Sequence, residues 1–119
     1  MIRPTHKELT NKLKQAFDFV KDEKVGLIKQ VVLAEDAIEL GYSIEFELFD
    51  VLTELIESAT PDHYSGSRPP QESYADEISG LELFAFVVEI DRFDGPVYFK
   101  FSISQDGFWL VSLHIDRKE

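Results

Sequence analysis

Residues 97–115 read VYFKFSISQDGFWLVSLHI, and this stretch decides the fold. Apolar and polar residues alternate over residues 97–103, and a mostly apolar stretch, 108–115, follows Asp106-Gly107, a pattern typical of two antiparallel strands joined by a tight turn. A further apolar run, from Leu81 to Ile90, comes before it, with Asp94-Gly95-Pro96 as a second turn signal. The sequence therefore predicts three antiparallel strands within residues 81–115.

The length of the turn at Asp106-Gly107 sets which side chains meet across the hairpin. A three-residue loop from Gln105 to Gly107, with Gly107 in the left-handed region, pairs Ser104 with Phe108. A two-residue Asp-Gly loop pairs different residues and mixes polar with apolar side chains on each face. We favour the three-residue loop because it separates the two kinds of residue.

In that register, polar and apolar side chains lie on opposite faces of the sheet. The polar face carries Tyr98, Lys100, Ser112 and His114. The apolar face carries Val97, Phe99, Phe101, Ile103, Trp109, Val111 and Leu113. We expect the apolar face to pack against helices and the polar face to meet solvent.

The first half of the chain predicts helices within residues 5–58. Thr5 and Glu8 have the spacing of a capping box, and Ser43 is a good N-cap for a helix that ends near Ser58. Residues 25–40 fit either a buried helix or a strand followed by a helix, and we favour mostly helix with a stop at Gly41. Residues 60–79 contain Pro61, Gly66, Pro69 and Pro70 together with several Ser, Asp and Tyr, and predict one long loop.

These elements predict a single α+β domain over residues 1–119, with N-terminal helices packed on a C-terminal three-stranded antiparallel sheet. A chain of this length buries enough surface to fold without a metal or a disulfide. Cysteine is absent, which excludes thiolate zinc sites and cysteine nucleophiles. The carboxylates of residues 35–54 recur at helical spacing, as on a solvated face, so we expect no metal site and no cofactor.

Charge restricts the partners. The chain has 23 Asp and Glu against 12 Lys and Arg, a formal charge of -11, which disfavours generic binding to nucleic acids or anionic membranes and suits basic partners. The first residues lack the apolar stretch of a secretory signal, and the run from Leu83 to Val88 is too short to cross a bilayer. We therefore expect a cytoplasmic protein without a membrane partner.

Tyr98, Lys100 and His114 are the kinds of groups that cleave RNA without a metal. Such cleavage needs a base for the 2′-hydroxyl, a cation for the phosphorane and an acid for the leaving oxygen. The same residues also fit an ordinary solvent-facing side of a sheet. As substrate-binding candidates we add Ser112, the loop residues His63 and Arg68, and the phosphate-neutralising Arg92 and Arg117.

Four short phrases carry a family resemblance: ELGY at 39–42, DHYSG at 62–66, GPVYFK at 95–100 and VSLH at 111–114. With them, the last two-thirds of the chain resembles the MqsR (motility quorum-sensing regulator) toxins, relatives of the RelE-like ribonucleases. The resemblance implies a RelE-like fold and a metal-independent mRNA endoribonuclease of a type II toxin-antitoxin pair. It also implies a cognate antitoxin protein that masks the enzyme.

Carried over residue by residue, Tyr98 matches a family tyrosine of the catalytic face, and Lys100 matches the basic residue two positions on. His114 stands where many members have lysine or histidine, and an imidazole there can act as acid or base. The formal charge of -11 favours an alternative on the same fold. That alternative is a non-catalytic acidic interaction protein, such as an antitoxin, an immunity protein or a nucleic-acid mimic.

Overall fold

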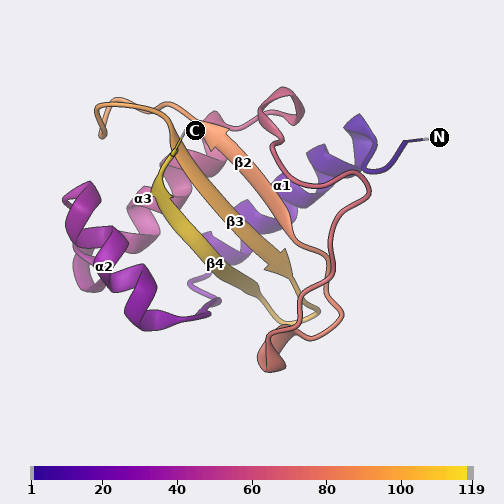
Figure 1. Cartoon of the computed structure of the whole chain (residues 1–119), viewed down its shortest axis with the longest axis horizontal. Helices are drawn as coiled ribbons and strands as arrows, with labels where there is room; N and C mark the ends of the chain where they lie inside the picture. The colour runs from indigo at the N-terminus through magenta and orange to yellow at the C-terminus, as the bar shows by residue number, and fades with distance from the viewer. Residues whose placement is uncertain (1, 118–119) are drawn as a thin grey trace.

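The structure, a computed structural model, describes residues 2–117 and shows an α+β fold (Figure 1). The first half contains α1 (His6–Lys21), β1 (Val25–Leu27), α2 (Gln30–Leu40) and α3 (Ile44–Ser58). The second half contains β2 (Phe84–Val88), β3 (Val97–Ile103) and β4 (Phe108–Ile115), after two short 3-10 turns at Pro61–His63 and Asp76–Ile78. α1 and α3 lie behind the sheet in Figure 1, which leaves its front face uncovered by helices.

The predicted helix signals at residues 5, 41 and 43 are confirmed. The Thr5 hydroxyl accepts a hydrogen bond of 3.1 Å from the Glu8 N–H and so caps α1. Ser43 caps α3 in the same way, and α3 ends at Ser58 as expected. Gly41 follows α2 with φ of 85°, the left-handed conformation that glycine adopts without strain.

The sheet has four strands and is mixed, so the expected three-stranded antiparallel sheet is incomplete. Its order is β1-β4-β3-β2, and β1 runs parallel to β4. Residues 25–40 therefore form a strand and then a helix, and our preference for a mostly helical segment was wrong at its start. Gly26 lies opposite Trp109, and an added Cβ would come within 2.5 Å of the indole ring, so only a residue without a side chain fits there.

The β3–β4 turn differs from the prediction. Ile103 pairs with Phe108, so the loop has four residues, 104–107, and the Ser104 N–H donates to the Gly107 carbonyl at 2.9 Å. The three-residue loop and its Ser104–Phe108 pair were therefore wrong. Gly107 is not left-handed, because positive φ among the described glycines occurs at Gly41 and Gly80 alone. Its missing side chain instead leaves room for the Lys24 carbonyl, which would lie 2.8 Å from an added Cβ.

A β-bulge at Val111 compensates for the different turn. The register shifts between Lys100 and Phe101, so that Lys100 faces Ser112 whereas Phe101 faces Leu110, and Val111 has no partner on β3. The shift restores the predicted Lys100–Ser112 pair and, beyond it, the Tyr98–His114 pair.

The bulge also changes which β4 residues are buried. Before it, Phe108 and Leu110 are fully buried, whereas Trp109 and Val111, which we expected in the core, are only half-buried. The predicted apolar face was therefore wrong at these positions. On β3 it is confirmed for Val97, Phe99 and Phe101.

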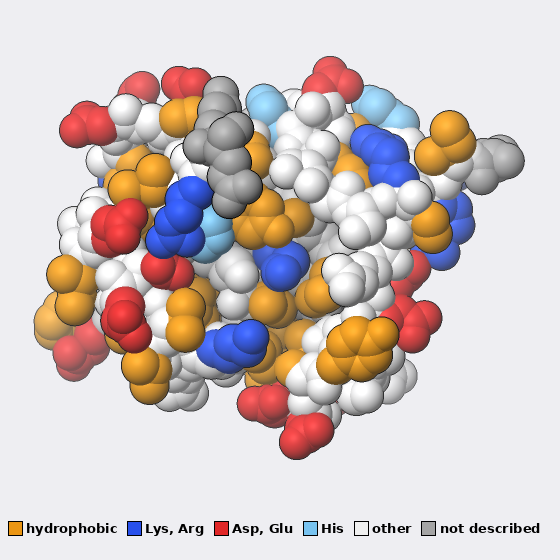
Figure 2. All heavy atoms as spheres, viewed as in Figure 1, with side chains coloured by type: hydrophobic (Ala, Val, Ile, Leu, Met, Phe, Trp, Pro, Cys, Tyr) orange, Lys and Arg blue, Asp and Glu red, His pale blue; other side chains and the backbone are white. Residues whose placement is uncertain are grey.

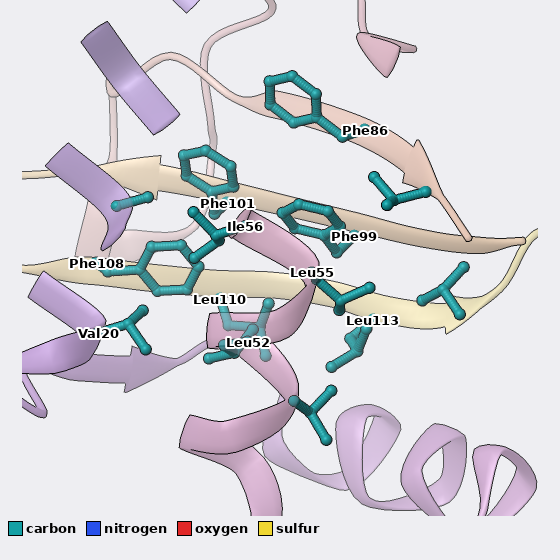
Figure 3. Close-up of a cluster of buried hydrophobic side chains, with 14 of the residues drawn as sticks. Val20, Leu52, Leu55, Ile56, Phe86, Phe99, Phe101, Phe108, Leu110 and Leu113 are labelled. Carbon is teal, nitrogen blue, oxygen red and sulfur yellow. The ribbon is translucent and has the colours of Figure 1, made fainter. Parts of the chain in front are cut away.

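Stacked phenylalanines form the core between the sheet and the helices (Figure 3). The Phe101 ring centroid lies 4.9 Å from that of Phe108 and 6.0 Å from that of Phe99. Leu52 and Leu55 of α3 are fully buried and face the same layer from the helix side, Leu52 beside Leu110. Burial of each such side chain contributes about 1.5–3 kcal/mol, so this layer fixes how the helices and the sheet sit together.

The segment between α3 and β2 is irregular, as expected, and it is tied to β2. Tyr64 forms a bridge with Phe86, and the Ser65 N–H donates to the Ala85 carbonyl at 2.8 Å. Farther along, the Leu83 N–H donates to the Gln71 carbonyl at 2.8 Å. The segment runs beside β2 and then past the end of β3 in Figure 1, so it borders the uncovered face.

The close approach of the Lys24 carbonyl to Gly107 can be tested by substitution. We expect Gly107→Ala to lower the free energy of unfolding by about 1–3 kcal/mol, because a methyl group there meets a backbone carbonyl that cannot rotate away. Gly95→Ala is the matched control: nothing lies within 4 Å of its added Cβ, and its effect should stay within about 0.5 kcal/mol. Urea denaturation measures both, and equal effects of the two substitutions would contradict the packing argument.

Candidate functional site

The uncovered face of the sheet is less acidic than the chain as a whole. In Figure 2, which looks onto this face, Lys and Arg side chains lie over the middle of the sheet, while Asp and Glu side chains lie mostly toward the margin. Local charge decides what a surface attracts at short range, because screening weakens more distant charges. A formal charge of -11 therefore does not prevent this face from receiving a phosphate.

Tyr98 and His114 form a stacked pair on this face. They are cross-strand partners, and their ring centroids lie 4.9 Å apart with an interplanar angle of 12°. His114 Nδ1 lies 2.7 Å from the Ile115 carbonyl oxygen, so Nδ1 carries a proton and donates to it. This leaves Nε2 as the ring atom that can exchange a proton with a ligand.

Tyr98 is held as a neutral phenol. Burial raises the pKa of its hydroxyl, and the nearby carboxylate of Asp116 raises it further by repelling the phenolate. A phenol that keeps its proton acts as a hydrogen-bond donor or an acid. The stacked pair therefore places a donor and an acceptor side by side.

Lys100 adds a positive charge to the Tyr98–His114 pair, and we call these three residues the cluster. It lies two residues after Tyr98 on the same face, about 7 Å along the strand, and pairs with Ser112. Burial lowers the pKa of its ammonium group, and the positive charge of Lys29 lowers it further. None of the ion pairs formed among residues 2–117 includes either lysine. A bound phosphate would therefore relieve an unfavourable charge.

His63 lies in the 3-10 turn that contacts β2. Its Nδ1 accepts a hydrogen bond of 2.9 Å from the Thr60 N–H, so in the neutral ring the proton lies on Nε2. His63 lines a hollow of about 440 Å³ together with Asp116 and Val87, the β2 partner of Tyr98. The structure thus places this predicted substrate-binding residue beside β2, in a hollow that Tyr98, Lys100 and His114 do not line.

The three arginines proposed from the sequence lie elsewhere or are already paired. The Arg68 guanidinium lies 4.9 Å from the centroid of the Tyr64 ring, at the β2 border of the face. Arg92 forms ion pairs with Glu47 and Glu54 of α3, at 2.8 Å and 2.5 Å, on the helical side of the molecule.

Arg117 pairs with α2. Its guanidinium lies 3.4 Å from an oxygen of Asp36 and 3.9 Å from one of Glu39. Arg92 therefore lies outside the cluster of Tyr98, Lys100 and His114. The charge of Arg117 is partly neutralised by two carboxylates. Both arginines sit where carboxylates compensate them, which sequence spacing did not reveal.

Lys29 is the basic residue that the sequence reading missed. It lies between β1 and α2, and it lines the same hollow as Lys100 because β1 adds to the edge of β4. The apolar run after Lys24 was the available signal, since a strand there places the following residue at the uncovered face.

Within residues 2–117, no group of three or more His, Cys, Asp or Glu side chains is arranged to hold a metal ion. Over the same residues, no helix has the length and apolar character needed to cross a membrane.

No protein-family model matches the chain, and no curated protein matches it in sequence. The site is therefore interpreted from its own geometry.

The surroundings of Lys100 predict how its ammonium group titrates. Burial and a neighbouring like charge both favour the neutral amine, so the Lys100 side chain should lose its proton at a lower pH than a solvent-exposed lysine does. Lys29→Asn should shift the titration midpoint back toward higher pH without restoring it fully, because burial remains. NMR of the labelled lysine side chain measures this, with Lys14→Gln on the exposed side of α1 as the control. An unchanged midpoint in Lys29→Asn would contradict the proximity of the two charges.

Proposed function

We propose that this protein is a metal-independent endoribonuclease that cleaves mRNA in the cytoplasm, as the toxin of a type II toxin-antitoxin pair. The observation that carries the proposal is the cluster of Tyr98, Lys100 and His114 on one face that the helices leave uncovered. The resemblance of the last two-thirds of the chain to the MqsR toxins, and through them to the RelE-like fold, supports the same reading.

In this mechanism Nε2 of His114 takes the proton from a 2′-hydroxyl of the RNA. The 2′-oxygen attacks the adjacent phosphorus, and the bond from phosphorus to the 5′-oxygen breaks, which leaves a 2′,3′-cyclic phosphate. Lys100 stabilises the negative charge of the phosphorane, and Tyr98 gives its proton to the leaving 5′-oxygen. The protonated imidazole then returns a proton to the tyrosinate through solvent.

His63 and Ser112 complete the proposed site. The Ser112 hydroxyl lies on the same face as Lys100 and can donate to a phosphate oxygen. His63, whose Nε2 proton is fixed by the hydrogen bond at Nδ1, can donate to the RNA from the hollow that it lines together with Val87.

One observation favours the second candidate, an acidic interaction protein. Val31 and Ile38 of α2 are 73% and 81% exposed, and Glu35 and Glu39 lie beside them on the same helix. Figure 2 shows the resulting mixture of apolar and acidic side chains on the left, over α2. Such a surface suits a basic partner with apolar anchors.

Growth and transcript mapping test the ribonuclease proposal. Induction of the wild-type chain in bacteria that lack a partner should arrest growth and produce new 5′ ends in primer extension. Tyr98→Phe and His114→Ala should each reduce cleavage by about 10²–10⁴-fold, because each removes a proton-transfer group. His6→Ala, an exposed substitution on α1, is the control and should cleave like wild type. Normal growth and intact transcripts despite soluble wild-type protein would favour the acidic interaction protein.

Chelation tests the independence from metals. Cleavage of a labelled single-stranded RNA by the purified protein should proceed at the same rate with and without EDTA, since Lys100 supplies the positive charge that a divalent ion supplies in other nucleases. The measurement is the initial rate on a denaturing gel, with a magnesium-dependent nuclease as the positive control for chelation. A rate that falls with EDTA and recovers with magnesium would overturn this mechanism.

A further inference from the structure

A second hollow, of about 480 Å³, opens on the other side of Lys100 from Tyr98. One wall is the segment 71–75 of the long loop, and the opposite wall carries Lys29 at the start of α2. Apolar side chains such as Leu83 and Val111 line its inner part. Its volume lies within the range of about 300–1,000 Å³ that is common for small-ligand sites.

Two lysines line this hollow. Lys29 does so from the N-terminal end of α2, and Lys100 does so from β3. Neither takes part in an ion pair among residues 2–117. Glu72 is the carboxylate on the rim, and its side chain is exposed to solvent. Two uncompensated cations beside one hollow are suited to a single bound phosphate group.

An exposed aromatic ring stands on the same rim. Tyr74 is 89% exposed, although its neighbour Ser73 is buried and held by the backbone. The Ser73 N–H donates to the Leu81 carbonyl at 2.8 Å, and the Ser73 carbonyl accepts from the Gly80 N–H at 2.9 Å. The ring is therefore presented to solvent by an anchored wall, which is the arrangement that proteins use to stack an unpaired base.

We propose that this hollow binds one nucleotide of a single-stranded RNA, with its phosphate between Lys29 and Lys100 and its base stacked on Tyr74. The inference rests on the proposed function, because Lys100 would then contact both this nucleotide and the phosphate that is cleaved. The subsite holds the strand across the sheet and sets its position relative to His114. Recognition by stacking and charge accepts several bases, so this subsite provides affinity more than sequence selection.

Binding of an RNA that cannot be cleaved tests the subsite separately from catalysis. The probe is a fluorescent single-stranded oligonucleotide with 2′-O-methyl groups, and fluorescence anisotropy gives Kd at several salt concentrations. Tyr74→Ala should raise Kd by roughly 5- to 100-fold, because stacking on an aromatic ring is lost. Lys29→Asn should raise Kd and lower the slope of log K against log salt by about 0.7, the value for one phosphate contact on a single strand.

Further variants distinguish a specific contact in the subsite from a nonspecific effect of net charge on RNA binding. Asn tolerates the left-handed backbone of Lys29, whose φ is 57°, and Lys29→Gly is a second variant if Lys29→Asn folds poorly. Lys14→Gln removes the same charge from the exposed side of α1 and should leave the salt slope unchanged. Glu72→Gln should lower Kd, because it removes the carboxylate that opposes the phosphate.

The outcomes distinguish this inference from the proposed function. Cleavage by wild type, with Kd and KM unchanged in Tyr74→Ala and Lys29→Asn, would overturn the subsite and leave the ribonuclease standing. Binding that depends on both residues without any cleavage would support the subsite and overturn the proposed chemistry. Equal losses in Lys29→Asn and Lys14→Gln would also overturn the subsite, since they would show a nonspecific effect of charge.

Discussion

The arrangement of the candidate site depends on the β-bulge at Val111. A side chain in a strand points to the face opposite that of its neighbour, so a shift of one residue reverses every position that follows. The four-residue loop between Ile103 and Phe108 alone would leave His114 out of register with Tyr98. The unpaired residue at the bulge corrects the register halfway along β4. Phe108 and Leu110, before the bulge, therefore lie in the core, and Ser112 and His114, after it, lie opposite Lys100 and Tyr98.

The parallel strand β1 is the second constraint. It covers the outer edge of β4, and the residues on either side of it are also bound, since the Lys24 carbonyl accepts from the Phe108 N–H and the Ile28 N–H donates to the Leu110 carbonyl. This pairing fixes the direction in which the chain leaves the sheet and places Lys29 at the hollow that Lys100 also lines. An edge strand of three residues thus decides which charges meet on the uncovered face.

The sequence predicted what depends on local chemistry. Thr5, Gly41 and Ser43 act on their own helix ends, so their roles could be inferred without knowing the fold. The cross-strand partners of Tyr98 and Lys100 were also predicted, although two compensating errors contributed, a wrong loop length and an unrecognised bulge. A bulge leaves little trace in an alternating pattern, because Val111 suits either face. The pairing of β1 with β4 joins distant segments, and local periodicity carries no information about such contacts.

Lys29 and Lys100 each lower the stability of the folded state. The folded-state pKa of Lys100 lies below that of the unfolded chain, so its protonated form disfavours folding, and this cost diminishes only as the pH rises through the folded-state pKa. Lys29 adds a left-handed backbone that a non-glycine residue adopts at some cost. Carboxylates pair with Arg92 on the helical side, but no lysine among residues 2–117 forms an ion pair. What sets Lys29 and Lys100 apart is that both line one hollow, where the phosphate of the proposed subsite would supply the missing charge.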